Sequence, residues 1–206
     1  MDGRDNPRRL CGSPGHDEGN GYEKRKRTKM NQRQTNAAPN ELRGASIIAA
    51  IKQSGIEFVL SVPDIVTSEG LLRPIAHDRD LRLVRVCKED ECIAIAMGLA
   101  VTGKRSLTLI QNTGLLDSLN AVRGVAVEYE QPICFMVGLL GREPERPPRE
   151  SERYGVRIVE PILDAMGIAH HLIEAEGDVA KIAPAIETAY AQSRPVALLI
   201  GRRPVP

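Results

Sequence analysis

The chain has 206 residues, of which 42% are hydrophobic, and its formal net charge is +1. This composition supplies enough apolar material for one sizeable core, and the balanced charge gives no reason to expect a nucleic-acid partner. The sequence contains no apolar run of membrane-spanning length and no signal-peptide core at its start, so we expect a cytoplasmic protein without a membrane partner.

Four cysteines are present, Cys11, Cys87, Cys92 and Cys134, and no two of them have CxxC spacing. Three of the four lie in apolar runs. We therefore expect reduced, buried thiols, and neither a disulfide framework nor a metal site.

Residues 1–40 are polar, rich in Gly, Asn, Arg and Lys, and without periodicity, which predicts a disordered tail before a single domain at 41–206. The basic run at 24–29 is typical of solvated charge, with a nucleic-acid or targeting patch as the alternative. A start of translation at Met30 is a further alternative, under which residues 1–29 would not belong to the protein.

From residue 41 onward, apolar periodicity predicts helices and strands in alternation. The expected strands are 56–62, 81–86, 106–110, 132–138, 169–173 and 196–200, and the expected helices are 41–55, 71–75, 89–103, 119–126, 159–166 and 178–192. This order predicts an α/β fold with a doubly wound, mainly parallel, six-stranded sheet.

The helix expected at 89–103 opens with three acids, Glu89, Asp90 and Glu91. Its later residues are apolar on every side, so we expect it to be buried nearly all round. Acids in a first turn complement the helix dipole, which is one interpretation. The other is that a carboxylate at the mouth of a buried helix is partly desolvated and handles protons.

Polar residues follow two other expected strands. Asp64 follows the strand at 56–62, where an Asp is typical of a helix start or an ordinary turn. Gln111, Asn112, Thr113 and Gly114 follow the strand at 106–110, where a glycine with amides allows a flat ligand to approach the backbone. The alternative is a plain strand-to-helix turn with an Asn cap.

The stretch at 141–153 holds four arginines and three prolines and cannot form a regular element. The guanidinium groups of Arg142, Arg146 and Arg149 suit a sulfonate, phosphonate or carboxylate. Interleaved Arg and Glu are equally typical of a solvated loop. His170 and His171 fall in the fifth expected strand, and we interpret them as structural.

Two motifs carry a resemblance to thiamine diphosphate enzymes. The first resembles a helix of their pyrimidine-binding domain that reads roughly E-x(4)-A-x-A-x-G-x-A-x-x-T-G, through Glu89, Ala94, Ala96, Gly98 and then Thr102-Gly103. The second, LIQNTGLLDSLN at 109–120, is similar to the MQNSGLGNSIN segment of sulfopyruvate decarboxylase alpha subunits and phosphonopyruvate decarboxylases. It departs from them at Leu116 and Asp117, where those proteins often have Gly-Asn.

The resemblance implies a thiamine diphosphate-binding fold in which Glu89 hydrogen-bonds the pyrimidine ring as the catalytic acid–base group. It also implies that residues 111–114 line the cofactor and that Asp64, Arg142, Arg146 and Arg149 contact the substrate. The implied activity is that of a carboxy-lyase alpha subunit converting 3-sulfopyruvate to sulfoacetaldehyde and CO2.

The family's Gly-Asp-Gly and Asn-Asn pattern for magnesium and diphosphate does not occur in 42–206. The resemblance therefore implies a hetero-oligomer in which a beta subunit holds both. A phosphonopyruvate decarboxylase-type subunit is one alternative, and a non-catalytic α/β binding or regulatory module is the other.

Overall fold

The computed structural model describes residues 41–206. The predictions for the segment 1–40, including its disorder, Cys11 and the alternative start at Met30, lie outside the described residues.

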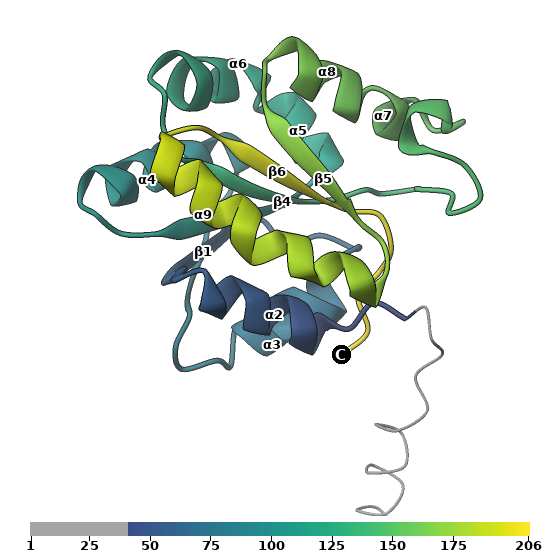
Figure 1. The fold of residues 1–206 in the computed structure, drawn as a ribbon, viewed down its shortest axis with the longest axis horizontal. Coiled ribbons are helices and arrows are strands. Elements are labelled where there is room, and N and C mark those ends of the chain that lie inside the picture. Colours follow the sequence, from purple (N-terminus) through teal and green to yellow (C-terminus); the bar gives the residue numbers. More distant parts are fainter. Residues whose placement is uncertain (1–40) are drawn as a thin grey trace, which may run out of the picture. The chain divides into compact units, whose positions relative to one another are not determined.

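A six-stranded sheet, parallel throughout, forms the centre of the domain (Figure 1). Its strands are β1 (Phe58–Ser61), β2 (Arg82–Arg85), β3 (Ser106–Gln111), β4 (Cys134–Gly138), β5 (Ala169–Ile173) and β6 (Val196–Ile200). Their spatial order is β2-β1-β3-β4-β6-β5. The predicted α/β class is confirmed, and the direction of winding reverses between β1 and β3.

Helices cover both faces of this sheet (Figure 1). On one face lie α2 (Gly44–Gln53), the π-helical turn η1 (Ser68–Leu72), α3 (Arg73–Ile75), η4 (Glu176–Lys181) and α9 (Ile182–Gln192). On the other lie α4 (Glu89–Val101), α5 (Asn112–Asp117), α6 (Leu119–Ala121), the π-helical η2 (Val122–Glu128), α7 (Tyr154–Arg157) and α8 (Val159–Ala165), with a 3₁₀ turn η3 (Pro148–Glu150) before α7. No helix within 41–206 is both long and apolar enough to cross a bilayer.

Strand alternation divides the interior into two cores. In β4, Cys134 and Met136 pack with α2 and α9, whereas Phe135 and Val137 pack with α4, η2 and α8. Successive side chains of a strand point to opposite faces, and a central parallel strand is covered on both. This explains why β4 is an unbroken apolar run whose five residues are all buried.

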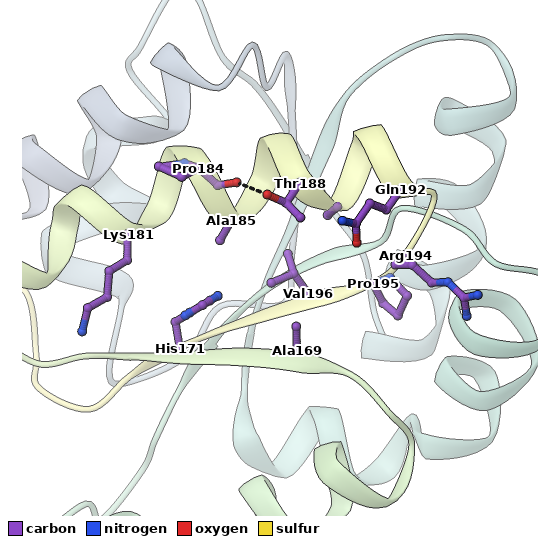
Figure 2. A pocket seen from close by; sticks show the side chains of 11 residues that line it. Ala169, His171, Lys181, Pro184, Ala185, Thr188, Gln192, Arg194, Pro195 and Val196 are labelled. Atoms are coloured by element: carbon purple, nitrogen blue, oxygen red, sulfur yellow. Dashed lines mark hydrogen bonds between the residues drawn. The ribbon is translucent and has the colours of Figure 1, made fainter.

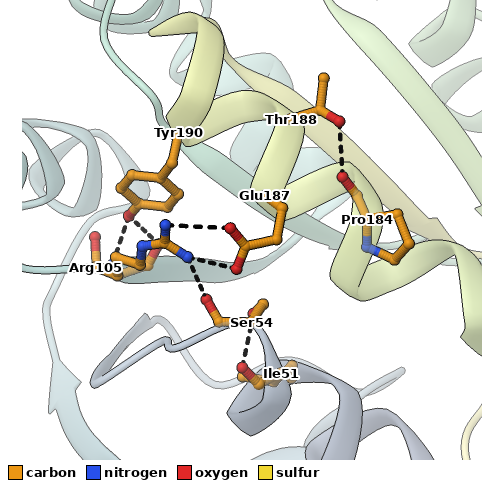
Figure 3. Close-up of polar contacts among 8 residues, drawn as sticks. Ile51, Ser54, Arg105, Pro184, Glu187, Thr188 and Tyr190 are labelled. Atoms are coloured by element: carbon orange, nitrogen blue, oxygen red, sulfur yellow. Dashed lines mark hydrogen bonds and ion pairs between the residues drawn. The ribbon is translucent and has the colours of Figure 1, made fainter.

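Arg105 ties the amino end of β3 to the helices on one face (Figure 3). Its Nη1 donates to the carbonyl of Ser54 at 2.6 Å and to Glu187 Oε1 at 2.6 Å. Its guanidinium carbon lies 4.7 Å from the centroid of the Tyr190 ring, and the Tyr190 hydroxyl accepts a hydrogen bond from the Ser106 N–H at 2.8 Å. This network stabilises the edge of the sheet opposite to the carboxyl ends of the strands.

Two predictions about burial are corrected. Helix α4 is not buried nearly all round, because β1, β3 and η2 cover one side and leave Ala94, Gly98 and Val101 exposed. Cys92 and Cys134 are buried as expected, but Cys87 is exposed because it lies in the turn between β2 and α4.

Candidate active site

The segments that follow β1, β2 and β3 all begin at the carboxyl edge of the sheet, beside the point where the winding reverses. Open α/β sheets bind ligands at such a switch point, because the connections leave in opposite directions and open a crevice. Asp64, Glu89 and residues 112–114 belong to these connections, and Gln111 is the last residue of β3.

Glu89 and Gly114 are in direct contact across this edge. Glu89 is the first residue of α4 and is half-buried, and Gly114 lies in the first turn of α5 and is buried. A Cβ atom at position 114 would overlap the Glu89 side chain from Cγ to Oε1. The absence of a side chain at Gly114 therefore allows the Glu89 carboxylate to lie there.

The three acids at the start of α4 differ in their surroundings. Glu91 Oε2 accepts hydrogen bonds from the backbone N–H groups of Cys87 (3.0 Å) and Lys88 (3.3 Å), which is a capping arrangement. Asp90 lies 3.6 Å from Lys88 Nζ. No group within 41–206 donates a hydrogen bond to the Glu89 carboxylate, so the helix start is capped while Glu89 remains available to a ligand.

Asn112 joins three segments of the site. Its side chain is almost fully buried, its Nδ2 donates to the carbonyl of Gly155 at 2.9 Å, and its Oδ1 accepts from the Leu140 N–H at 3.0 Å. Helix α5 begins at Asn112 and has no side-chain cap, so the Asn-cap interpretation does not apply. The Asn112 side chain instead connects α5 to the loop after β4 and to the first turn of α7. Gln111 Oε1 accepts from the Thr113 hydroxyl at 2.8 Å.

Asp64 is buried and fully engaged by its own turn. Its Oδ1 accepts from the N–H groups of Val66 (2.6 Å) and Thr67 (2.8 Å), and its Oδ2 accepts from the Thr67 hydroxyl. A Cβ at Gly138 would lie 2.9 Å from Val66 Cβ, so glycine at the end of β4 lets this turn pack there. These contacts support the turn interpretation, and a substrate contact by Asp64 stays a prediction.

The arginines of the loop after β4 do not gather at one place. Arg146 pairs with Glu152 at 3.1 Å, and Arg149 pairs with Glu160 at 3.0 Å and with Asp164 at 2.5 Å. Both are partly exposed and hold the loop to its own neighbours.

Arg142 differs, because its side chain is 3% exposed and lies beside Glu174 at the carboxyl ends of β4 and β6. Arg142 lines a cavity of about 380 Å³ there, together with Val66, Leu140, Gly201, Arg202 and Arg203. Arg202 and Arg203 follow β6 after Gly201, and they were not among the residues predicted from the sequence. The sequence could have indicated them, because they follow a predicted parallel strand and so lie at the same edge of the sheet as the other candidate residues.

The two histidines, His170 and His171, are not among the residues of the candidate site. His170 contacts the carbonyl of Ile168 through Nδ1 at 3.2 Å. His171 lines a groove of about 400 Å³ between β5 and α9 (Figure 2), where burial, with lesser contributions from His170 and Lys181, lowers its pKa. Neither belongs to the candidate active site.

The fold and the position of these residues define a doubly wound α/β protein whose candidate site occupies the switch point of a parallel sheet. No protein-family model matches the chain.

Comparison with curated proteins shows which protein the chain resembles. The sulfopyruvate decarboxylase alpha subunit of Methanocaldococcus jannaschii is 29% identical over 160 residues, which cover 77% of this chain and 93% of that protein. The alpha subunits of Methanococcus maripaludis (31% over 96 residues) and Methanothermobacter thermautotrophicus (33% over 100 residues) match 47% and 48% of this chain, and 57% and 60% of their own lengths. The predicted resemblance to sulfopyruvate decarboxylase alpha subunits is confirmed.

Proposed function

We propose that this chain is the alpha subunit of a thiamine diphosphate-dependent decarboxylase that converts 3-sulfopyruvate to sulfoacetaldehyde and CO2. The curated relatives, which are named as sulfopyruvate decarboxylase subunits, indicate a decarboxylase and hence a carboxy-lyase. The single observation that carries the proposal on the structural side is the Glu89 carboxylate lying over Gly114 at the switch point.

The residues present fit the pyrimidine end of the cofactor. Thiamine diphosphate supplies an electron sink for the electrons that a departing CO2 leaves behind. Glu89 offers a half-buried carboxylate that receives no hydrogen bond from the described residues and can share a proton with a ring nitrogen. Gly114 leaves space for a ring close to the backbone, and Gln111 and Thr113 place polar groups beside it.

A second subunit completes the proposed site. Within 41–206 no three His, Cys, Asp or Glu side chains gather closely enough to hold a metal ion, so a beta subunit would hold magnesium and the diphosphate. Ala94, Gly98 and Val101 form an exposed apolar face on α4, the helix that carries Glu89. A partner that packs against this face would lie next to the candidate site, in a cytoplasmic hetero-oligomer.

The test is CO2 release from 3-sulfopyruvate by the purified chain, alone and with a candidate beta subunit. We expect turnover only from the pair, with thiamine diphosphate and Mg²⁺ present. Calorimetry should likewise show tight cofactor binding by the pair and not by the chain alone. Decarboxylation by the isolated chain would contradict the need for a partner, and an inactive pair that binds the cofactor would contradict the substrate.

Phosphonopyruvate is the second candidate substrate, and the arginine-lined cavity favours it as much as sulfopyruvate because guanidinium groups bind both anions. A comparison of kcat/KM for the two substrates in the same preparation decides between them.

A further inference from the structure

Three arginine residues line the cavity at the carboxyl ends of β4 and β6. Arg142 comes from the loop after β4, and Arg202 and Arg203 come from the segment after β6. Within 41–206 neither Arg202 nor Arg203 forms an ion pair with a carboxylate. Among the described residues, Glu174 is the carboxylate that pairs with one of these arginines, Arg142, so the described lining of the cavity carries a surplus of positive charge.

The pairing of Arg142 with Glu174 leaves donors unused. Arg142 Nη2 donates to Glu174 Oε2 at 3.2 Å, whereas Nε lies 2.9 Å from Oε1 but is not aligned for a hydrogen bond. Arg142 Nη1 is buried and has no acceptor among the described residues. Burying an unpaired donor of a charged group is costly, so an acceptor is expected to occupy this space.

Arg202 has the same deficiency. Its Nε is buried without an acceptor in the part of the chain that the structure describes. Gly201, just before it, is where a Cβ would overlap the Glu174 carboxylate, so glycine at this position lets Glu174 reach Arg142. Arg142 and Arg202, from the ends of β4 and β6, therefore line one cavity, and each has a buried donor without an acceptor among the described residues.

This cavity adjoins the candidate active site through two contacts. Leu140, which lines the cavity, donates its N–H to Asn112, two residues before the Gly114 that Glu89 covers. Val66, which also lines it, belongs to the turn that Asp64 holds. An anion in the cavity would therefore lie at the same edge of the sheet as Glu89.

We propose that Arg142, Arg202 and Arg203 form a binding site for a sulfonate or phosphonate group, and that this site holds the anionic tail of the substrate. The second half of the proposal rests on the proposed function. Guanidinium groups bind the oxygens of such anions through paired, charge-assisted hydrogen bonds, and the donors left unpaired here are of that kind.

The first experiment measures binding and needs no turnover. Sulfoacetate, which carries a sulfonate and does not decarboxylate by the proposed route, is titrated into the full chain, alone and with its partner, by calorimetry. We expect Arg202→Gln and Arg203→Gln each to weaken binding by about tenfold. Arg203 is exposed, so its variant should fold normally. Arg79→Gln, an exposed arginine before β2, removes the same charge elsewhere and should bind as the native chain does.

The second experiment measures kinetics in the assembled enzyme. Arg203→Gln should raise KM for 3-sulfopyruvate while leaving kcat and the KM for pyruvate little changed, because pyruvate lacks the tail. Absence of sulfoacetate binding, or an equal loss in the Arg79→Gln control, would overturn the anion site. Equal effects on both substrates would overturn its role toward the substrate tail. If sulfoacetate binds through the arginines but the pair releases no CO2 from 3-sulfopyruvate, the anion site stands and the proposed function fails.

Discussion

The carboxylate of Glu89 occupies the space that a side chain at position 114 would need. The two residues belong to different helices, α4 and α5, which follow different strands of the sheet. Their contact brings the two sequence motifs together at one place in the fold. It also makes the position of the Glu89 carboxylate depend on the absence of a side chain at residue 114.

Exchange of Glu89 for Gln should lower kcat of the assembled enzyme by at least ~100-fold, because the amide keeps the shape but cannot share a proton. Steady-state CO2 release measures this loss. Asp90→Asn should be far milder. Glu91→Gln should also be mild, whereas Glu91→Ala should lower the free energy of unfolding by on the order of 1 kcal/mol, since it removes the oxygen that caps α4. Near-normal turnover in the Glu89 variant would rule out its catalytic role.

Gly114→Ala should reduce activity even though Glu89 itself is unchanged. The added methyl group would force the carboxylate away from α5, and a small displacement of a catalytic group can cost on the order of 100-fold in rate. Gly124→Ala is the matched control, because a Cβ at that position meets no atom within 4 Å. Equal activity of the two variants would show that the Glu89 position is not critical.

Ala94→Lys should prevent assembly with the beta subunit without unfolding the chain, because it places a charge on the exposed face of α4. Size-exclusion chromatography with light scattering would report the lost complex, and circular dichroism the retained fold. Ala191→Lys, on the exposed side of α9, is the control and should still assemble. Assembly by both variants would place the partner elsewhere.

Stability should decline in alkaline solution. Burial raises the pKa of the Cys134 thiol from 9.0 to about 12 and that of the Tyr190 phenol from 10.0 to about 12. A group whose pKa is higher in the folded than in the unfolded state contributes stability. This contribution is fully present at pH values below the unfolded pKa and is lost as the pH rises through the folded pKa. Urea unfolding should therefore show a falling free energy of unfolding from about pH 9 upward, and Cys134→Ala should flatten the curve. A pH-independent free energy in this range would refute the expectation.

Alkylation should distinguish the described cysteines. Cys87 is exposed and should react with iodoacetamide in the native protein, whereas Cys92 and Cys134 should react only after unfolding. Burial, followed by the negative charge of Glu89, raises the pKa of the Cys92 thiol to about 12, which disfavours the reactive thiolate. Peptide mass mapping before and after denaturation measures the pattern, and rapid native labelling of Cys134 would contradict it.

The sheet could be predicted from the sequence because buried parallel strands leave a strong local signal. The apolar run at 196–200 coincides with β6, and the run at 132–138 contains β4 with two further residues at its start. Glycine, proline and asparagine mark where such strands end. The grouping of Asp64, Glu89 and Gly114 at one edge follows from parallel strands, because all of them end on the same side.

What could not be predicted depends on spatial order. Arg202 and Arg142 share a cavity because β4 and β6 are neighbours, although β5 lies between them in the chain. Apolar residues on every side of α4 also gave no means of distinguishing a helix buried in its own domain from one with a face open to a partner. Arg146 and Arg149 lie in an irregular loop, whose ion pairs the residue order does not reveal.

The segment after β6 returns to the beginning of the domain. The Val205 N–H donates to the carbonyl of Leu42 at 2.9 Å, and the Gly44 N–H donates to the carbonyl of Val205 at 2.7 Å. The two ends of the described domain therefore lie side by side and are joined by hydrogen bonds. A short peptide could link them at little entropic cost. Circular permutation that reopens the chain at the exposed turn around Gly167 would then keep every strand pairing. The permuted chain would have the same sheet with a different order of connections, and its new termini would lie away from the arginine-lined cavity.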